Sequence, residues 1–490
     1  MKRFRRRTII VLALASLMIL GIASTAVAFT AYIHQDAGQT SYSYAGWYIY
    51  DDPVIHVRDP NTLGTSLDLH NSEIATYTPS IDLGGVGTAT APSAVGVAMA
   101  TESAMLFLNN SHIYSFGSNQ FQGPQCVYAS TAYVSLMDCL VYGDSLAAHG
   151  LLVEKGGSIN AERTTIITNK NGPSGSAVAG AFDTSGVITL HACEIHSWGT
   201  DDAAAYYATG STSVTDTKAY AHESEGAWID GGGDMKLDWS PVDQTYALAM
   251  YNSSLYAYKN FGVSFAKGPL SDVADDTDAG FAMAGGYLES AKASFYAPNS
   301  KALILLDGMS NYSYDGTLLT TLWTGQGPGG GEPTKDSQTQ PGSRESTADL
   351  FATGCQLKGD VITDVDEYTE KNSTVNMHLS GWTDYAGALN KADRGVVNLY
   401  MAKEADWHVT ADSYLGVVDV PTVDTNHNPA DGMRTWLSFS PDLSKVFSNG
   451  HTIYYNSFAD PSIEVKTYPL PGGGWLVPEV DLSAAALWNW

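Results

Sequence analysis

The chain has 490 residues, with 25 Lys and Arg against 52 Asp and Glu, and its formal net charge is −27. A surface this acidic repels nucleic acid and anionic lipid, so we expect no nucleic-acid partner; it is typical of proteins that are soluble outside the cell or bind cations. The nucleotide-binding G-x-x-x-x-G-K-S/T, redox C-x-x-C and hydrolase G-x-S-x-G motifs do not occur in the sequence. The length allows two or three domains, but a solenoid grows by adding coils, so one long domain is equally allowed.

The first 28 residues have the pattern of a signal peptide. Five of the first seven residues are basic, an apolar run covers residues 9–22, and Ala26 and Ala28 form an A-x-A cleavage site. The pattern predicts a protein that is secreted or held at the cell surface, with Phe29 at its N-terminus and a net charge of −32. An uncleaved anchor is the alternative, because the uncharged stretch that ends at Ala28 is 21 residues long and can just span a bilayer. No second apolar run of that length follows, so we expect no membrane span in the mature chain.

A repeat organises the chain between residues 93 and 225. Four eight-residue windows align without gaps, each with an apolar first residue, a small sixth residue and a β-branched last residue. Two weaker copies start at Val214 and Leu288 and place Ala219 and Ala293 at the sixth position. Successive sixth positions lie 25 to 29 residues apart, which is the period of a supersecondary unit. The four windows are LFLNNSHI (106–113), VSLMDCLV (134–141), INAERTTI (159–166) and ITLHACEI (188–195), with Ser111, Cys139, Thr164 and Cys193 at the sixth position.

This period predicts a coil of three short strands rather than a pair of helices. Helix-pair repeats need about 33 to 47 residues, and no 3.6-residue spacing is present here. In a parallel β-helix each coil stacks about 4.8 Å above the last, so one position per coil forms a column. A column of Ser, Cys, Thr and Ala fits an inward-facing position at a tight corner. The alternative is chance similarity among segments rich in Ala, Ser and Thr.

The prediction is therefore an all-β, parallel β-helix with a cap at each end. Residues 29–92 form the N-terminal cap and first strands, residues 93–405 the β-helix, and residues 406–490 the final coils and C-terminal cap. Caps are expected because the open edge of a solenoid recruits other chains. Residues 325–347 have the Gly, Pro and Ser composition of a flexible excursion from the solenoid.

The four cysteines of this exported chain would ordinarily indicate two disulfides. The repeat instead places Cys139 and Cys193 in one column two coils apart, about 9 to 10 Å, which is beyond the reach of a disulfide. Cys355 falls in the same column in the segment LFATGCQL, and Cys126 lies on another part of the coil that contains Cys139. We expect buried, unpaired thiols that serve as small hydrophobic side chains.

Four further segments are distinctive: the repeat block 179–199, the phrase EGAWIDG at 225–231, W-x-V-T-x-D-S at 407–413 and NGHTIYY at 449–455. Together they resemble secreted right-handed parallel β-helix proteins of the adhesin-like, autotransporter-passenger-like kind. The resemblance covers roughly residues 90 to 460. It implies a right-handed solenoid with a surface or extracellular role in adhesion or matrix.

An enzyme on the same scaffold is the rival interpretation, since many β-helices are polysaccharide lyases or glycoside hydrolases. Asp201 and Asp202 offer paired carboxylates for acid and base catalysis, as glycosidases require. The phrase Trp228-Ile229-Asp230 resembles W-I-D-H of pectate lyases, but glycine replaces the histidine and no arginine-rich companion motif follows. Paired Asp at a coil corner is more often a solvated turn, so Asp201, Asp202 and Asp230 are weak catalytic candidates.

A calcium site is the one cofactor that the sequence suggests. Asp272, Asp275, Asp276 and Asp278 place four carboxylates within seven residues, enough oxygen atoms for a hard cation. The segment lacks the glycine and terminal Glu of an EF-hand, so a solvated acidic loop is the alternative. Other metals have weaker support: His191 and His196 share a coil, but their odd separation predicts opposite faces, which argues against a zinc pair.

Taken together, the sequence predicts a binding protein without catalysis, whose ligand is an extracellular polysaccharide or a surface protein. Tyr outnumbers Phe 28 to 14. Tyr on an exposed strand offers a flat ring with a polar tip, which suits sugars and protein partners. The alternative is that these tyrosines border a cap or merely cover the outer face of the solenoid.

Overall fold

The computed structural model describes the solenoid strands and most of their connections. The described residues are 33–35, 43–44, 47–50, 55–78, 96–117, 125–145, 149–169, 179–181, 186–199, 204–208, 211–229, 279–298, 301–322, 346–364, 373–416, 418–419, 422–424, 439–441, 443–456 and 465–479. The predicted signal peptide and nearly all of the predicted excursion at 325–347 lie outside these residues.

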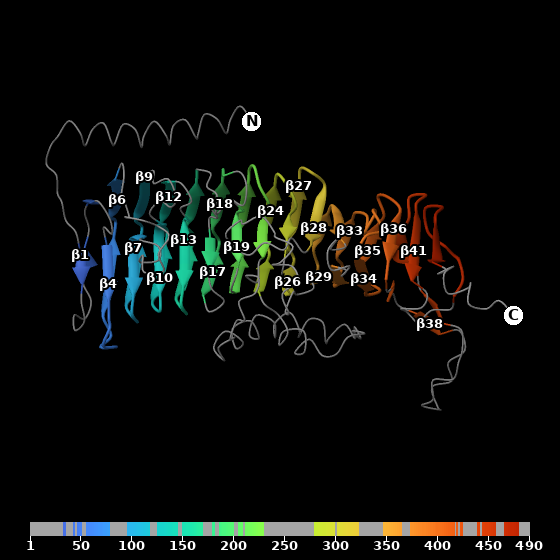
Figure 1. Ribbon diagram of the computed structural model, residues 1–490, viewed down its shortest axis with the longest axis horizontal. Coiled ribbons are helices and arrows are strands. Elements are labelled where there is room, and N and C mark those ends of the chain that lie inside the picture. The colour runs from blue at the N-terminus through green and yellow to red at the C-terminus, as the bar shows by residue number, and fades with distance from the viewer. Residues whose placement is uncertain are drawn as a thin grey trace, which may run out of the picture.

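Three long sheets run along the molecule, and every neighbouring pair of strands within them is parallel (Figure 1). Sequence order cycles through the three sheets, which is the topology of a parallel β-helix. The first sheet has 11 strands. They are β1 (Ile33–Gln35), β4 (Ile55–Arg58), β7 (Gly96–Thr101), β10 (Gln125–Ser130), β13 (Leu151–Glu154), β16 (Ala179–Ala181), β19 (Tyr206–Ala208), β22 (Ala227–Ile229), β25 (Phe295–Tyr296), β28 (Thr317–Thr321) and β31 (Asp360–Thr363).

The second sheet has 13 strands and carries the strongest repeat windows. They are β2 (Ser43–Tyr44), β5 (Ser66–His70), β8 (Met105–Asn109), β11 (Tyr133–Met137), β14 (Ser158–Glu162), β17 (Val187–His191), β20 (Ser211–Thr215), β23 (Ala279–Ala284), β26 (Lys301–Asp307), β29 (Thr347–Thr353), β32 (Thr374–Ser380), β34 (Val396–Met401) and β37 (Val418–Asp419).

The third sheet also has 13 strands, several of which are labelled along the upper edge of Figure 1. They are β3 (Trp47–Tyr50), β6 (Glu73–Thr78), β9 (His112–Gly117), β12 (Leu140–Ser145), β15 (Thr165–Thr168), β18 (Glu194–Ser197), β21 (Lys218–Ala221), β24 (Tyr287–Ser290), β27 (Ser310–Ser313), β30 (Gln356–Lys358), β33 (Asp384–Ala386), β35 (Asp406–His408) and β40 (Val446–Phe447). The predicted fold class is confirmed. Solenoid strands occur on both sides of the 93–405 range, from Ile33 to Phe447.

The backbone register confirms the gapless alignment of the four strong repeat windows. Leu106 pairs with Val134, and the column continues through Ile159 to Ile188. All four side chains are fully buried. They point inward because alternate residues of a strand face opposite sides of its sheet.

The two weak copies were aligned wrongly. Ala219 pairs with Ile195, two residues beyond Cys193, so the equivalent of Cys193 in that coil is Thr217. In the next coil the equivalent residue is Gly286 rather than Ala293, because Lys218 pairs with Tyr287. The slip at Ala219 is two residues, which preserves the alternation of inward and outward side chains, so hydrophobicity alone does not reveal it. Ala293 lies seven residues after Gly286, beyond the end of β24, so that copy was misplaced by a whole strand.

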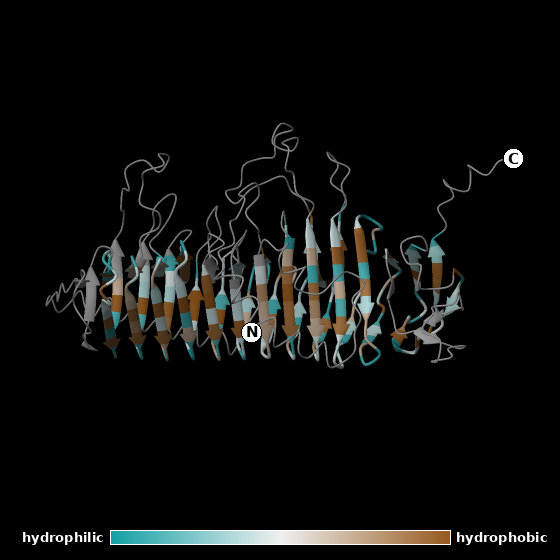
Figure 2. Ribbon diagram, turned by 90° about the horizontal axis from the view of Figure 1, so that it is seen from below, coloured by the Kyte–Doolittle hydropathy of each residue, from teal (hydrophilic) through white to brown (hydrophobic). Residues whose placement is uncertain are grey.

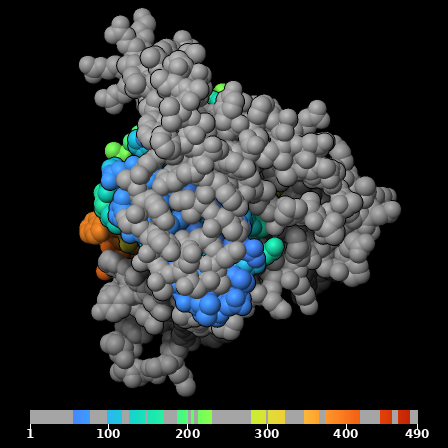
Figure 3. Space-filling view, turned by 90° about the vertical axis from the view of Figure 1, so that its left-hand side faces the viewer, coloured from blue at the N-terminus to red at the C-terminus, as the bar shows by residue number. Residues whose placement is uncertain are grey.

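Buried hydrophobic side chains form one continuous core inside the solenoid. Hydrophobic residues recur from strand to strand along the molecule (Figure 2). Aliphatic side chains fill the first coils, whereas the middle of the core contains three aromatic rings. The ring centroid of Phe281 lies 5.2 Å from that of Tyr206 and 5.9 Å from that of Phe295. Figure 3 views the molecule along its long axis, with the first coils, in blue, nearest the viewer.

The corner between the second and third sheets is built the same way in coil after coil. A residue with a left-handed backbone is followed by a slot residue that directly precedes a strand of the third sheet. The left-handed residues include Asn71, Asn110, Asp138, Arg163, Ala192, Asp216, Gly285, Gly308 and Gly354, with φ between 46° and 64°. The corner slot comprises Ser72, Ser111, Cys139, Thr164, Cys193, Thr217, Gly286, Met309, Cys355, Thr383 and Ala405.

Hydrogen bonding explains why the corner slot prefers Ser and Thr. The N–H of each left-handed residue and the C=O of each slot residue bond to the next coil, as in Asn110 N–H to Met137 O at 2.8 Å. The N–H of the slot residue lies outside this ladder, and a hydroxyl in the next coil accepts it. Thr164 Oγ1 accepts the N–H of Cys139 at 3.3 Å, and Thr217 Oγ1 accepts that of Cys193 at 3.2 Å. Because a buried N–H without a partner is costly, small polar side chains are favoured here.

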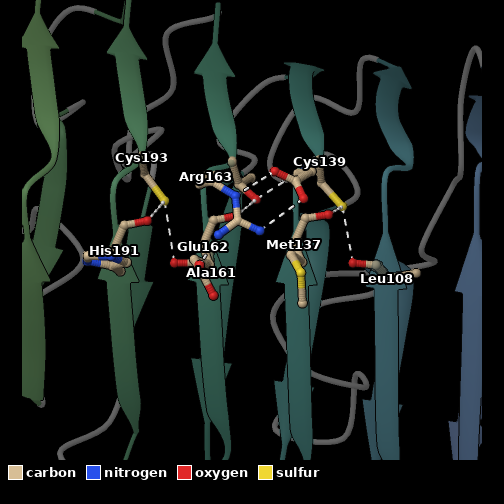
Figure 4. A network of polar contacts seen from close by, with 10 residues as sticks. Leu108, Met137, Cys139, Ala161, Glu162, Arg163, His191 and Cys193 are labelled. Atoms are coloured by element: carbon tan, nitrogen blue, oxygen red, sulfur yellow. Dashed lines mark hydrogen bonds and ion pairs between the residues drawn. The ribbon is translucent and has the colours of Figure 1, made fainter.

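Cysteine occupies the corner slot as a substitute for serine. The thiol of Cys193 donates to the carbonyl oxygens of His191 and Ala161 at 3.3 and 3.4 Å (Figure 4). Two coils earlier, the thiol of Cys139 makes the equivalent contacts with the carbonyl oxygens of Met137 and Leu108. All four cysteines are free and buried, which confirms the prediction. Burial raises the pKa of Cys139 to about 11 and that of Cys355 to about 12, so both thiols stay protonated and unreactive at neutral pH.

Charged left-handed residues pair between adjacent corners. The guanidinium of Arg163 bonds both carboxylate oxygens of Asp138, at 2.8 and 3.0 Å, and also contacts Glu162 (Figure 4). Arg163 lowers the pKa of Asp138. This bidentate pair links two neighbouring coils on the outside of the corner. The corner slot residues lie on the inside of the same corner.

The C-terminal end closes with smaller sheets. A bridge between Val361 and Leu389 and a bond from the N–H of Tyr414 to Leu389 O (3.0 Å) extend the first sheet into a four-stranded sheet. Its last pair is antiparallel, a geometry that turns the chain back and covers an open edge. The remaining elements are β36 (Ser413–Leu415), β41 (Thr452–Asn456), β43 (Trp475–Glu479) and β42 (Tyr468–Pro469) in this sheet, the antiparallel pair β38 (Thr422–Asp424) and β39 (Phe439–Pro441), and the 3-10 helix η1 (Leu443–Lys445).

Within the described residues, the structure contains no helix that is long and apolar enough to cross a membrane.

The corner slot predicts different outcomes for three substitutions of Cys193. Cys193→Leu overpacks the corner and should lower the free energy of unfolding by about 1 to 3 kcal/mol, and Cys193→Ala should cost less. Cys193→Ser should change it by less than about 1 kcal/mol, because a hydroxyl can make the same bonds to the carbonyl oxygens. Denaturant unfolding of the three variants checks this order; a leucine variant as stable as the wild type would contradict it.

The left-handed backbone at Ala192 predicts a stabilising substitution. An alanine with φ of 52° costs about 1 to 2 kcal/mol that glycine avoids, although glycine loses about 0.5 to 1 kcal/mol of entropy on folding. Ala192→Gly should therefore raise the melting temperature, whereas the control Ala161→Gly, in a buried strand position, should lower it. Equal effects of both variants in a thermal melt would show that the corner conformation is not strained.

Candidate functional site

The predicted catalytic and calcium residues lie outside the described part of the chain. This applies to Asp201, Asp202 and Asp230, and to the loop with Asp272, Asp275, Asp276 and Asp278. Both hypotheses therefore remain predictions. Among the described residues, no group of three or more His, Cys, Asp or Glu side chains is placed to hold a metal ion.

The expected placement of the two histidines was wrong. His191 and His196 both lie on the outside of the solenoid, His191 on β17 of the second sheet and His196 on β18 of the third. The corner between them restarts the strand alternation, so an odd separation no longer means opposite faces. His196 instead meets His222, which follows β21 in the next coil.

The outer face of the third sheet gathers tyrosines around one carboxylate. Glu289 on β24 pairs with Tyr220 on β21 on one side and with Tyr312 on β27 on the other. Tyr287 lies two residues before Glu289, and Tyr314 lies two residues after Tyr312, so strand alternation places all five side chains on the outside. We call these five residues the tyrosine cluster.

Hydrogen bonds hold the tyrosine cluster together. The hydroxyl of Tyr287 donates to Oε2 of Glu289 and that of Tyr314 donates to Oε1, both at 3.0 Å. The bond to Glu289 raises the pKa of Tyr314, and burial followed by that carboxylate raises the pKa of Tyr287. Both phenols therefore stay protonated as donors.

Two rings of the cluster are open to solvent. Tyr314 is 67% exposed and Tyr312 is 43% exposed, while their ring centroids are only 5.0 Å apart and nearly perpendicular. Tyr220 meets Tyr287 edge-on at 6.1 Å. The face therefore presents exposed aromatic rings at two orientations beside a carboxylate, and we take it as the candidate site.

A stack of aromatic rings continues the cluster toward the N-terminus. His196 lies parallel to Tyr220 with ring centroids 4.9 Å apart and parallel to His222 at 5.4 Å, and Trp198 lies on His222 at 3.6 Å. We call Trp198, His196 and His222 the histidine stack. It extends the aromatic packing over the two coils that precede Glu289, with Trp198 and His222 partly exposed and His196 buried between its neighbours.

A chain of hydrogen bonds sets the protonation of the histidine stack. Nε2 of His196 lies 3.0 Å from Oε1 of Glu194, and its Nδ1 lies 3.2 Å from Nε2 of His222. With Nε2 of His196 donating to Glu194, its Nδ1 accepts from His222. Burial, followed by the repulsion that His196 exerts whenever its ring is charged, lowers the pKa of His222 to about 4. His222 is therefore neutral at neutral pH.

Other aromatic groups lie elsewhere on the solenoid, among them a column on the first sheet and a pair on the C-terminal sheet. On the first sheet, Tyr207, Trp228 and Tyr296 pair in adjacent coils with ring centroids 6.1 and 4.6 Å apart. The tryptophan of the lyase-like phrase thus belongs to a packed aromatic column. On the C-terminal sheet, Tyr414 stacks on Tyr454 at 4.8 Å. Neither group surrounds a carboxylate in the manner of Glu289.

The sequence contains a pattern that marks the aromatic face of the third sheet, but it is hard to recognise in a chain with 28 tyrosines. Aromatic residues two positions apart with a small residue between them recur as HSW (196–198), YAH (220–222) and YSY (312–314). The register places His196, Tyr220 and Tyr312 in one column. Recognising the pattern requires that register, because the 49 residues between β22 and β23 separate Tyr220 from Tyr312 in the sequence, whereas β21 and β24 are direct neighbours in the third sheet.

No protein-family model, curated protein or solved structure matches this chain.

The histidine stack predicts that folding depends on pH. The pKa of His222 in the folded state, about 4, lies below the ordinary value of about 6.5, so its contribution to stability is complete above about pH 6.5 and is lost as pH falls toward 4. His222→Phe keeps a ring on Trp198 without a titrating group. The difference in melting temperature between wild type and variant should shift in favour of the variant between pH 7 and 4. The exposed control His191→Phe should show no such shift; an unchanged difference for His222→Phe would contradict the prediction.

Proposed function

We propose that this protein binds glycans, without catalysis, on the outer face of its third sheet, as a secreted or cell-surface protein of adhesin-like type. The observation that carries the proposal is the pair of exposed rings of Tyr312 and Tyr314 beside the hydrogen-bonded carboxylate of Glu289. Sugars present apolar C–H faces that stack on aromatic rings and hydroxyls that bond to carboxylates.

The geometry of the solenoid supports a polymeric ligand. Neighbouring coils lie about 4.8 Å apart, so equivalent groups recur along the face as a regular ladder. The histidine stack and the tyrosine cluster occupy consecutive coils of this ladder from β18 to β27. An extended chain laid along the axis can therefore contact several coils, and many weak contacts add to a useful affinity.

Charge placement supports binding rather than cleavage on this face. Glycosidases need two carboxyl groups about 5 to 9.5 Å apart across the bond that is broken. Glu194 and Glu289 lie two coils apart and two residues offset, because Glu194 pairs with Lys218 and Lys218 pairs with Tyr287. Two strand spacings are already about 9 to 10 Å, before the offset along the strands is added. Secretion is supported by the signal-peptide pattern of residues 1–28.

The proposal is tested with the mature chain and a panel of polysaccharides and oligosaccharides. The double variant Tyr312→Ala, Tyr314→Ala should lose about tenfold or more in affinity, because each exposed ring contributes about 0.5 to 1.5 kcal/mol of stacking in addition to buried area. Tyr133→Ala, an outward tyrosine of the second sheet, is the matched control and should bind like the wild type.

Two results would overturn the proposal. Wild-type affinity in the double variant would remove the third-sheet face as the binding site. New reducing or unsaturated ends in the bound glycan would show catalysis, and would direct attention to Asp201, Asp202 and Asp230.

A further inference from the structure

The carboxylate of Glu289 is bonded by two phenols and by no cation of the described residues. Some other acidic side chains have a basic partner, as Glu225 has Lys292 at 3.6 Å and Asp360 has Lys391 at 2.6 Å, whereas Glu154 accepts a bond from a single phenol, that of Tyr128. Among the described residues, Glu289 forms no ion pair, and its two recorded bonds come from Tyr287 and Tyr314. The described residues therefore supply no ion-paired cation for this carboxylate.

This carboxylate can accept further hydrogen bonds. A carboxylate has about four acceptor positions, and the two tyrosine hydroxyls occupy one on each oxygen. The hydroxyl bonds also fix the orientation of the group, so a ligand does not have to order it on binding. The remaining positions suit a donor with a positive charge, since charge-assisted hydrogen bonds are about twice as strong as neutral ones.

The surrounding rings favour a cation as well. Tyr220 and Tyr312 lie on either side of Glu289 in the adjacent coils, and Tyr287 and Tyr314 complete the ring of phenols. The face of an aromatic ring attracts an ammonium group within about 6 Å of its centroid. A carboxylate inside a group of four such rings has the chemistry of an ammonium subsite.

The overall field acts in the same direction. The net charge of −27 raises the local concentration of cations and repels polyanions such as polyuronates. Lys218, in register with Tyr287, is the one Lys or Arg on β18, β21, β24 and β27, where Glu194 and Glu289 are the acidic side chains. A glycan that binds this face is therefore selected for positive or neutral character.

We propose that the tyrosine cluster is a subsite for the protonated amino group of an amino sugar, so that the glycan ligand is a polymer containing unacetylated hexosamine. This inference rests on the proposed function. It adds the chemical class of the ligand, because an N-acetyl group carries no charge and a uronate carries the wrong one.

The test compares matched oligosaccharides of equal length at about pH 6, where an amine with an ordinary pKa is protonated. A β-1,4-glucosamine hexamer should bind at least about tenfold more tightly than its fully N-acetylated form or a glucose hexamer, by calorimetry at physiological salt. An oligogalacturonate should bind more weakly than the neutral oligomers. Competition with a lysine-rich peptide measures whether the subsite accepts a protein ammonium group instead.

Glu289→Gln is the decisive variant. The amide keeps the shape of the side chain and removes its charge, so the preference for the amino hexamer should fall to less than about twofold, while binding of the acetylated hexamer changes little. Glu194→Gln removes one charge from the same face, two coils away, and should retain the preference. Thermal melts show that both variants are folded before binding is compared.

The outcomes separate the two proposals. If no oligosaccharide binds, the proposed glycan function fails. If neutral or acetylated oligomers bind as well as the amino hexamer, the function stands and the ammonium subsite is wrong. If Glu289→Gln and Glu194→Gln reduce the preference equally, the attraction is general electrostatics and the subsite is wrong. A peptide that binds through Glu289 more tightly than the amino hexamer overturns the assignment to an amino sugar.

Discussion

The corner between the second and third sheets is the constraint on which the rest of the solenoid depends. Each coil must turn sharply without leaving peptide groups unbonded, because the inside of the corner excludes water. A left-handed residue makes the turn. In the slot, a hydroxyl accepts the N–H of the preceding slot residue, and a small side chain avoids a clash with the neighbouring backbone. Gly286 shows the limit, since a Cβ there would clash with the carbonyl oxygen of Thr217 in the preceding coil. With this corner repeated, every coil adopts the same register as its neighbours.

That register converts sequence position into position on a surface. Inward columns are restricted to side chains that fill a narrow core, such as Leu106, Val134 and Ile159. Outward columns carry no packing requirement and can vary in chemistry from coil to coil. The column that contains Tyr142 and Ile167 near the N-terminus becomes His196, Tyr220, Glu289 and Tyr312 in the middle of the molecule. The candidate site is thus a local change of side chains on an unchanged scaffold.

The fold was readable from the sequence where the corner was regular. Small sixth residues at steps of 25 to 29 residues identified the four strong coils and the buried, unpaired cysteines, because the corner allows few side chains. The same reasoning failed for Ala219 and Ala293, where the slot residue is Thr217 or Gly286. At Ala219 the slip is two residues, which leaves the period-two alternation unchanged, and at Ala293 the window starts seven residues late, so only the backbone pairing could fix the register in both coils.

The sequence by itself determined the parallel β-helix, its acidic character and the abundance of tyrosine, because repeat length, charge and composition are local properties of the chain. Only the tertiary structure decided which tyrosines meet. Tyr220 and Glu289 are 69 positions apart in the sequence, yet pair in adjacent coils, since the long insertion after β22 leaves the stacking unbroken. A carboxylate among four phenols therefore arises from coil stacking, which no single coil encodes.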